Sequence, residues 1–248
     1  MNIQEILDLA EEYEQQLPDI TPTPYTLDES FAKFIDHTVL KPEATPDMIE
    51  ALCEDALKYN FASVCINPIF IPQAVEMLAD SDVDVCTVVG FPLGADPGSI
   101  KAMEAAEAIE HGAVEVDMVM AVGMLKGGAY QLVWDDIRAV AEACHRENAI
   151  LKVIHENCLL TEQEKIIACL ISKEAGADFV KTSTGFNSGG ATVEDIHLMR
   201  AVVGPAMGVK AAGGVRDVTA ARAMLENGAS RIGASAGVKI MEAINLLK

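Results

Sequence analysis

Residues 161–185 read TEQEKIIACLISKEAGADFVKTSTG and contain one complete helix-to-strand unit. The pattern predicts a helix over 162–174 and a strand over 178–183. Gly176 lies between them, where a glycine accommodates the left-handed backbone that commonly ends a helix. The strand leads into Thr182-Ser183-Thr184-Gly185, which is rich in hydroxyl groups.

The same unit recurs along the chain, and its joint is repeated at His111-Gly112-Ala113 and Asn227-Gly228-Ala229. Strands are predicted at 33–38, 62–66, 83–89, 113–119, 149–154, 178–183, 207–212 and 230–234. Helices are predicted at 46–58, 98–110, 131–146, 162–174, 193–201 and 217–226, and another follows residue 237. Eight alternations predict an α/β fold of the closed (β/α)8 TIM barrel type. An open doubly wound sheet is the alternative, but no GxGxxG sequence begins the first of its helices.

The N-terminal residues stand apart from this repeat. Residues 3–16 predict an amphipathic helix, and Pro18, Pro22 and Pro24 then mark a linker. We therefore expect a helical extension and linker over 1–28 and a barrel catalytic domain over 29–248. Apolar residues in the extra helix suggest a homodimer.

Composition limits the classes of function. The chain has 248 residues, is 50% hydrophobic and only 5% aromatic, and has a formal charge of −20. Nucleic acids and anionic membranes require basic patches, so neither is expected as a partner. The acidic start resembles no signal peptide, and no apolar run approaches the ~20 residues of a membrane span. These features predict a soluble, cytoplasmic protein.

The cysteine and histidine residues show no spacing typical of metal ligands. The six cysteines contain no CxxC pair, and the five histidines contain no HExxH motif. We interpret the cysteines as buried, reduced thiols. Neither a metal nor another cofactor is expected.

Three lysines lie on consecutive predicted strands. Lys152, Lys181 and Lys210 each have apolar neighbours, which alternation turns outward, so the lysines point into the barrel. The same rule points Asp117 inward from the preceding strand. A buried ion-pair network, or lysines that extend to the rim, would be a purely structural interpretation. However, burying three cations against only Asp117 and Glu156 is an inefficient way to stabilise a core.

A catalytic interpretation accounts for this cluster. A lysine with its ordinary pKa of about 10.4 is protonated at neutral pH and cannot attack a carbonyl. Neighbouring cations and desolvation both favour the neutral amine. Lys181 lies between the other two lysines and is the predicted nucleophile for imine formation. Asp117, with an ordered water, is expected to transfer protons. We expect it to hold Lys152, one strand away, more firmly than Lys181, two strands away.

Small residues follow predicted strands 7 and 8. Gly213-Gly214 comes after the seventh strand, and the eighth ends in Gly233-Ala234-Ser235-Ala236-Gly237. Backbone N–H groups of glycine-rich turns at helix N-termini bind phosphate without basic side chains. TIM barrels often bind phosphate in this region. The sequence therefore predicts a phosphate site there.

Six segments together resemble the deoxyribose-phosphate aldolase family, in order along residues 31–240. They are Asp36-His37-Thr38-Val39-Leu40-Lys41-Pro42, Ala62-Ser63-Val64-Cys65-Ile66, Glu115-Val116-Asp117, Leu151-Lys152-Val153-Ile154, Val180-Lys181-Thr182-Ser183-Thr184-Gly185-Phe186 and Val209-Lys210-Ala211-Ala212-Gly213-Gly214-Val215-Arg216. The resemblance implies reversible cleavage of 2-deoxy-D-ribose 5-phosphate to D-glyceraldehyde 3-phosphate and acetaldehyde.

The resemblance also assigns roles to residues. It implies that Lys181 forms the Schiff base, Asp117 relays protons and Lys210 is the activating neighbour. The expected substrate- and phosphate-binding residues are Lys152, Thr182, Gly185, Gly213, Gly214, Gly233 and Ser235. The expected partners are a sugar phosphate and aldehydes.

Two segments depart from the family pattern. His155-Glu156-Asn157 stands where an apolar residue, Glu and Thr are more usual, and Ala234-Ser235-Ala236 replaces a turn richer in hydroxyls. The second change puts phosphate affinity in question. A Schiff-base aldolase for another phosphorylated sugar is the alternative enzyme. A sugar-phosphate-binding regulator on an inactive scaffold is the alternative class, but the intact lysines and Asp117 argue against it.

Overall fold

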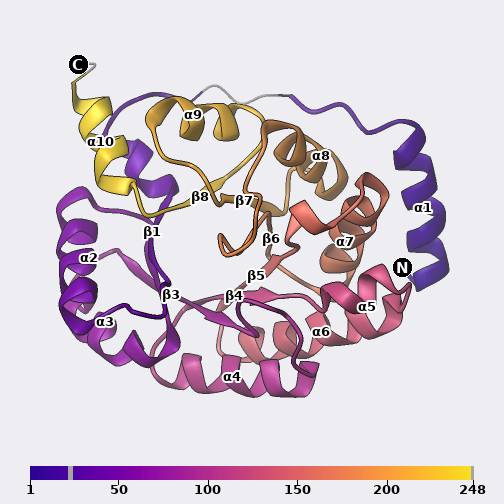
Figure 1. Cartoon of the computed structure of the whole chain (residues 1–248), viewed down its shortest axis with the longest axis horizontal. Helices are drawn as coiled ribbons and strands as arrows, with labels where there is room; N and C mark the ends of the chain where they lie inside the picture. The colour runs from indigo at the N-terminus through magenta and orange to yellow at the C-terminus, as the bar shows by residue number, and fades with distance from the viewer. Residues whose placement is uncertain (22–24, 247–248) are drawn as a thin grey trace.

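A closed barrel of eight parallel strands forms the centre of the molecule (Figure 1), in a computed structural model that describes residues 1–21 and 25–246. Neighbours in the barrel are neighbours in the chain, and β8 closes it by pairing with β1. The strands are β1 (Ile35–Val39), β2 (Ser63–Ile66), β3 (Asp84–Val89), β4 (Glu115–Val119), β5 (Ile150–Ile154), β6 (Phe179–Lys181), β7 (Gly208–Ala212) and β8 (Arg231–Ala234). The TIM-barrel prediction is confirmed.

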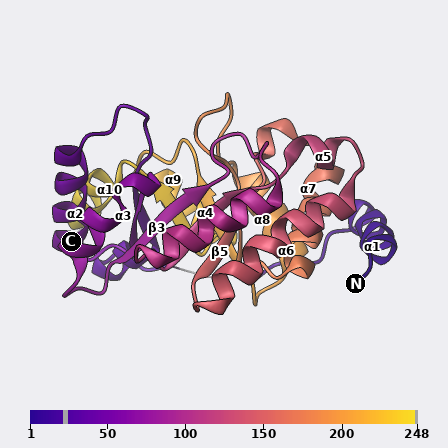
Figure 2. The same ribbon diagram turned by 90° about the horizontal axis from the view of Figure 1, so that it is seen from below.

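Helices surround the barrel, and the view from below shows them side by side along its outer wall (Figure 2). They are α2 (Pro46–Tyr59), α3 (Ile71–Leu78), α4 (Gly98–Glu110), α5 (Val122–Lys126), α6 (Tyr130–Arg146), α7 (Glu162–Ala175), α8 (Val193–Val203), α9 (Val218–Glu226) and α10 (Gly237–Asn245), with 3₁₀ turns η1 (Glu29–Phe34), η2 (Pro68–Phe70) and η3 (Asn157–Leu159). None of the helices in the described ranges is both long enough and apolar enough to cross a bilayer.

The helix ends show why the repeated unit folds as it does. Thr161 accepts a hydrogen bond from the backbone N–H of Glu164, whose carboxylate accepts one from the N–H of Thr161. This capping box begins α7, and Gly176, with φ +97°, ends it. The first predicted strand begins two residues too early, because Asp28 caps a 3₁₀ turn that includes residues 33 and 34.

Alternation along the strands divides the interior into two regions. Val116, Met118, Leu151 and Val153 are fully buried and belong to the apolar core cluster. The residues between them on these strands, Asp117 and Lys152, point the other way, into the barrel. The hydrophobic core therefore lies between strands and helices, while the barrel interior can hold charged groups.

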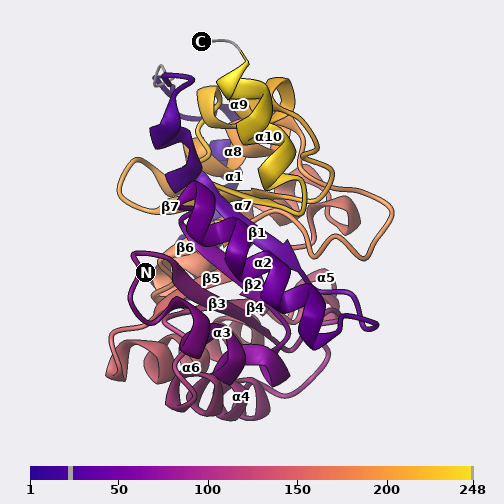
Figure 3. The same cartoon turned by 90° about the vertical axis from the view of Figure 1, so that its left-hand side faces the viewer.

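The N-terminal helix α1 (Ile3–Gln15) lies outside the ring, against α7 (Figure 1). In Figure 3 it lies behind the barrel, on the side away from the viewer. Ile6 and Ala10 are buried there, and Gln163 donates a hydrogen bond to Glu14 at 3.0 Å. The apolar face that suggested a homodimer is thus largely covered within the chain. The division into an extension (1–28) and a barrel (29–248) stays a prediction. Pro22 and Pro24 of the predicted linker lie outside the described residues.

Candidate active site

One carboxylate joins the three lysines inside the barrel. Asp117 accepts hydrogen bonds from Lys181 and Lys210 at 2.7 Å through Oδ2, and from Lys152 at 2.9 Å through Oδ1. All four side chains are buried. The inward orientation expected from alternation is therefore observed for all four. An eight-stranded barrel is narrow enough for side chains of non-adjacent strands to meet.

Three further charged residues, which sequence reasoning missed, belong to the same cluster. They extend it away from the mouth of the barrel, which is the end where the strands have their carboxyl termini. Lys210 forms an ion pair with Asp36 Oδ2 at 2.5 Å, and Lys152 forms one with Glu115 Oε2 at 2.6 Å. Arg231 bridges both acids, at 2.6 Å from Asp36 Oδ1 and 3.2 Å from Glu115. Glu115 could have been predicted from the sequence. It is two residues from Asp117 on the same strand, so both side chains point to the inward face.

Opposite charges dominate the titration of the cluster. Burial by itself would raise the pKa of Asp117, but Lys152, Lys181 and Lys210 together hold that pKa well below its ordinary value. Burial would likewise lower the pKa values of Lys152 and Lys210, yet the neighbouring carboxylates, led by Asp117, raise both. These two lysines are therefore held as ammonium ions.

One expectation about the acids is wrong. Glu156 was expected to compensate the lysines, but it accepts hydrogen bonds from the backbone N–H and the hydroxyl of Thr184. Its left-handed backbone, φ +58°, turns it towards that loop. Asp117 was expected to hold Lys152 more firmly than Lys181; its hydrogen bonds to the two are 2.9 Å and 2.7 Å long, and Lys152 is the lysine that does most to lower the pKa of Asp117.

Lys181 differs from the other two lysines in partners and in access. Lys152 and Lys210 each form ion pairs with more than one carboxylate, whereas Lys181 has Asp117 alone among the described residues. Lys181 is 2% exposed, while the other two are 0% exposed. It is also the last residue of β6, at the carboxyl-terminal end where TIM-barrel active sites lie. Lys181 is thus the cluster's amine nearest the mouth and the least neutralised.

Two thiols also face the cluster. The sulfur of Cys86 lies 3.3 Å from Asp117 Oδ1, and that of Cys65 lies 4.0 Å from Oδ2. Folding thus brings Cys65, Cys86 and Asp117 within 4.8 Å of one another, a grouping that the linear spacing did not predict. Asp117 already binds three ammonium groups, so a cation would have to compete with them for the same oxygens. The three residues do not form an open ligand set.

The turns after β7 and β8 are adjacent, as the phosphate prediction requires. Gly213 and Gly214 have φ values of +87° and +82°, and no atom lies within 4 Å of where a Cβ on Gly214 would stand. Gly233 packs against Lys210, and a Cβ there would lie 3.1 Å from Lys210 Cε. Ser235 is exposed just before α10, whose N-terminus has no side-chain cap. Backbone N–H groups at that terminus are therefore available to an anion.

The hydroxyl-rich segment after Lys181 divides into different environments. Thr182 Oγ1 donates to the carbonyl of Ala212 and accepts from its N–H, so it joins β6 to β7. Ser183 is buried beside Gly213, and its hydroxyl has no partner within the described residues. Sequence reasoning had not selected Ser183. Gly185, with φ +84°, is exposed in the loop above.

The other departure from the family pattern, His155, lies away from the lysines. Its Nε2 is 2.9 Å from Ser172 Oγ on α7, and the side chain is fully buried. Burial lowers its pKa to about 3, so the ring is neutral. This histidine is part of the packing between β5 and α7.

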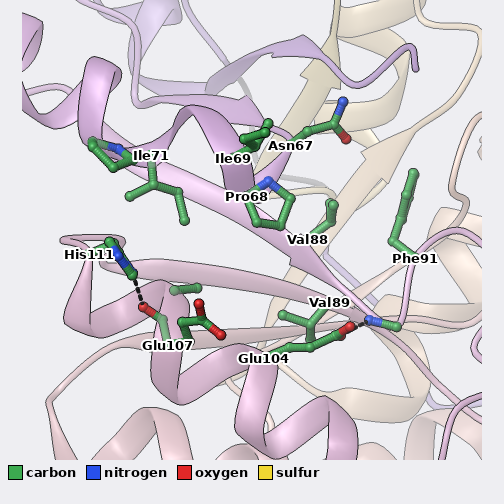
Figure 4. Close-up of a pocket in the computed structure, with 13 residues that line it drawn as sticks. Asn67, Pro68, Ile69, Ile71, Val88, Val89, Phe91, Glu104, Glu107 and His111 are labelled. Carbon is green, nitrogen blue, oxygen red and sulfur yellow. Dashed lines mark hydrogen bonds between the residues drawn. The ribbon is translucent and has the colours of Figure 1, made fainter. Parts of the chain in front are cut away.

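A surface pocket of about 470 Å³ lies on the outer side of the barrel (Figure 4). It is lined by residues of η2, α3, β3 and α4, and Glu104 there accepts a hydrogen bond from the N–H of Gly90. His111 contacts the carbonyl of Glu107 in the same pocket. None of the lysines lines it, so it is separate from the charged cluster.

Known proteins resemble this chain in sequence and in fold. Residues 31–243 match the family model described as DeoC/LacD family aldolase. A deoxyribose-phosphate aldolase from Caldanaerobacter subterraneus subsp. tengcongensis is 59% identical over 214 residues, which cover 86% of this chain and 93% of that protein.

Solved structures share the fold. A Coccidioides immitis protein provisionally assigned as a deoxyribose-phosphate aldolase superposes with a TM-score of 0.93 and 41% identity, covering 99% of this chain and 98% of its own. The deoxyribose phosphate aldolase of Aeropyrum pernix, described as a tetramer, gives a TM-score of 0.84 and 29% identity, with 100% of both chains covered.

Proposed function

The chain belongs to the DeoC/LacD aldolase family, and we propose from this that it cleaves 2-deoxy-D-ribose 5-phosphate reversibly to D-glyceraldehyde 3-phosphate and acetaldehyde. The reaction is of class I: a lysine forms a Schiff base with the substrate. The observation that supports this best is the buried lysine cluster, in which one amine faces the mouth and has a single carboxylate partner among the described residues.

Lys181 is the proposed nucleophile. An imine requires a neutral amine, and the lysine with the fewest negative partners is the one that most readily gives up its proton. Lys210 and Lys152 remain charged because several carboxylates surround them. Lys210 is the proposed activating neighbour, since its positive charge disfavours a second one on Lys181.

Asp117 is the proposed proton relay. Its carboxylate contacts Lys181 and Lys210 at once, so a proton leaving either amine has an acceptor within 2.7 Å. A carboxyl group with so low a pKa holds a proton only briefly. It therefore passes protons on, through a neighbouring amine or an ordered water, and does not store them.

The phosphate is proposed to bind where the turns after β7 and β8 meet the N-terminus of α10. Gly213, Gly214 and Gly233 have no side chain to cover their own backbone N–H groups, the space beside Gly214 is open, and Ser235 adds a hydroxyl. The unpartnered hydroxyl of Ser183 lies beside Gly213 and provides a further donor. Direct substrate contacts by Thr182, Gly185 and Lys152 remain predictions.

Borohydride reduction in the presence of deoxyribose 5-phosphate tests this proposal. We expect an adduct on the peptide that contains Lys181, together with release of acetaldehyde in the unreduced reaction. Lys181→Arg should abolish trapping, because a guanidinium stays charged. Lys173→Arg, on the exposed side of α7, is the matched control and should trap normally. An adduct on Lys152 or Lys210, or cleavage without a trapped adduct, would contradict the assignment.

The cellular location and the oligomeric state of the protein remain proposals. A cytoplasmic location is consistent with the six cysteines, all of which are free; five are buried as expected, but Cys158 is exposed. We also propose that the chain assembles into a homodimer. The Aeropyrum pernix relative is described as tetrameric, so self-association occurs in a similar protein.

A further inference from the structure

A continuous chain of ion pairs connects the mouth of the barrel to its opposite end. Lys181 contacts Asp117, Asp117 contacts Lys210, Lys210 contacts Asp36, and Asp36 contacts Arg231. A second branch runs from Asp117 through Lys152 and Glu115 to the same arginine. Arg231 and Glu115 begin their strands, so both lie at the end of the barrel remote from Lys181.

The cluster carries one more cation than it has carboxylates. Its four cations are Lys152, Lys181, Lys210 and Arg231, and its three acids are Asp36, Glu115 and Asp117. An unbalanced charge is expensive in a buried site. The excess is relieved when one cation loses a proton, and Lys181, which has one carboxylate partner among the described residues, is the least stabilised in its charged form.

Other ionisable groups also lie near the cluster. The thiols of Cys65 and Cys86 face Asp117 from β2 and β3; burial raises the pKa of Cys86 well above its ordinary value, whereas the hydrogen bond with Cys86 lowers the pKa of Cys65. Glu156, after β5, is engaged with Thr184. Asp84, at the start of β3, interacts electrostatically with Glu115 and Arg231, but it is exposed, so solvent screens its charge. The seven charged residues therefore contribute most of the charge around Lys181.

We propose that Arg231 and Glu115 are positioning residues of imine formation: without touching substrate, they set through their charges how readily Lys181 becomes the neutral nucleophile. This inference rests on the proposed Schiff-base function. Arg231 favours the neutral amine by maintaining the excess of positive charge. Glu115 opposes it, and it also holds Lys152 in place.

The alternative is that Arg231 only closes the end of the barrel. Its guanidinium lies 5.6 Å from the ring of Phe179, and its side chain is 14% exposed, so it does pack there. A packing role and an electrostatic role predict different outcomes. Loss of packing at either residue would change rates without a systematic change in pH dependence, whereas loss of charge would shift the pH midpoint in a direction fixed by its sign.

The experiment measures imine formation as a function of pH. Deoxyribose 5-phosphate is mixed with the full-length enzyme, and the reducible adduct is sampled by quenching into borohydride. Arg231→Met removes a positive charge and should move the midpoint up by about half to one pH unit, with a rate at neutral pH about three- to tenfold lower. Glu115→Gln keeps the shape, removes a negative charge and should move the midpoint down by a similar amount.

Two controls separate charge from structure. Arg231→Lys retains the charge and should restore a midpoint close to that of the wild type. Arg222→Met, at an exposed pair on α9, removes the same charge from the surface and should leave the midpoint unchanged. If circular dichroism shows that Arg231→Met does not fold, the pH midpoint of Glu115→Gln is compared with that of Arg231→Lys. A lower midpoint in Glu115→Gln supports the proposal, and equal midpoints contradict it.

The outcomes distinguish the two proposals. Absence of a trapped adduct in the wild type would refute the Schiff-base function itself. A normal adduct in the wild type, combined with unshifted midpoints or shifts of the same sign in both charge variants, would refute only the role of Arg231 and Glu115. Opposite shifts, with little change in KM for deoxyribose 5-phosphate, are the expected result.

Discussion

Replacing Asp117 by asparagine should separate imine formation from proton transfer. The carboxylate is fully buried and accepts hydrogen bonds from three ammonium groups at 2.7–2.9 Å. An asparagine has one acceptor oxygen and directs its NH₂ group at one or more of the lysines. Removing one partner from a buried ion pair costs about 3–5 kcal/mol. In a barrel of this size that corresponds to a fall in Tm of about 6–20 °C.

The catalytic effect should be larger and selective. Loss of a positioned acid–base group typically reduces kcat by about 10²-fold or more. Lys181 loses its carboxylate partner, so formation of the imine should persist while the later proton transfers fail. Two measurements are therefore made at a temperature where the variant is folded. Borohydride trapping reports imine formation, and exchange of solvent deuterium into the methyl group of acetaldehyde reports proton transfer. Near-normal turnover in the folded variant would show that the carboxylate is structural. Loss of trapping together with exchange would place Asp117 in imine formation itself.

Gly214→Leu should raise KM for deoxyribose 5-phosphate much more than KM for unphosphorylated deoxyribose, because the new side chain fills the proposed phosphate space. Gly204→Leu is the control for backbone strain, since Gly204 has a similarly positive φ at an open site after α8. Equal effects on both substrates would locate the phosphate elsewhere. Dialysis against EDTA should leave activity unchanged, since an imine provides the electron sink, and a loss restored by zinc would contradict this. The free energy of unfolding should decrease as pH falls from about 6.5 towards 3, because the unfolded chain binds a proton at His155 that the folded state, with a pKa of about 3 there, does not. The double variant His155→Leu/Ser172→Ala should show a shallower decrease in chemical denaturation, and an identical slope would exclude His155 as a source.

Alternation of side chains was sufficient to predict the centre of the site. Apolar neighbours fixed the outward face of each strand, so the amino-acid sequence alone assigned Asp117, Lys152, Lys181 and Lys210 to the interior, where all four are buried. The glycines at three helix-to-strand joints, Gly112, Gly176 and Gly228, helped to locate the strands that follow them to within two residues. Both inferences are local, since each depends on a few consecutive residues.

What the sequence could not supply was distance across the barrel. Asp36, Glu115 and Arg231 belong to β1, β4 and β8, and whether they meet depends on the stagger of the closed sheet. The same limit applies to Cys65 and Cys86, whose approach to Asp117 is set by register.

The charged chain from Lys181 to Arg231 also bears on how the polypeptide reaches its native state. Arg231 and Asp36 are separated by 195 positions in sequence, and Lys210 and Asp117 by 93. Until β8 docks beside β1, Asp36 and Glu115 lie in an incomplete barrel without Arg231. Burying carboxylates without this cation costs free energy, so partly folded structures are less stable. A one-residue slip of β8 would turn Arg231 out of the interior, so incorrect registers are disfavoured as well. The residues that tune the reaction would thereby make folding of the barrel more cooperative and its closure more specific.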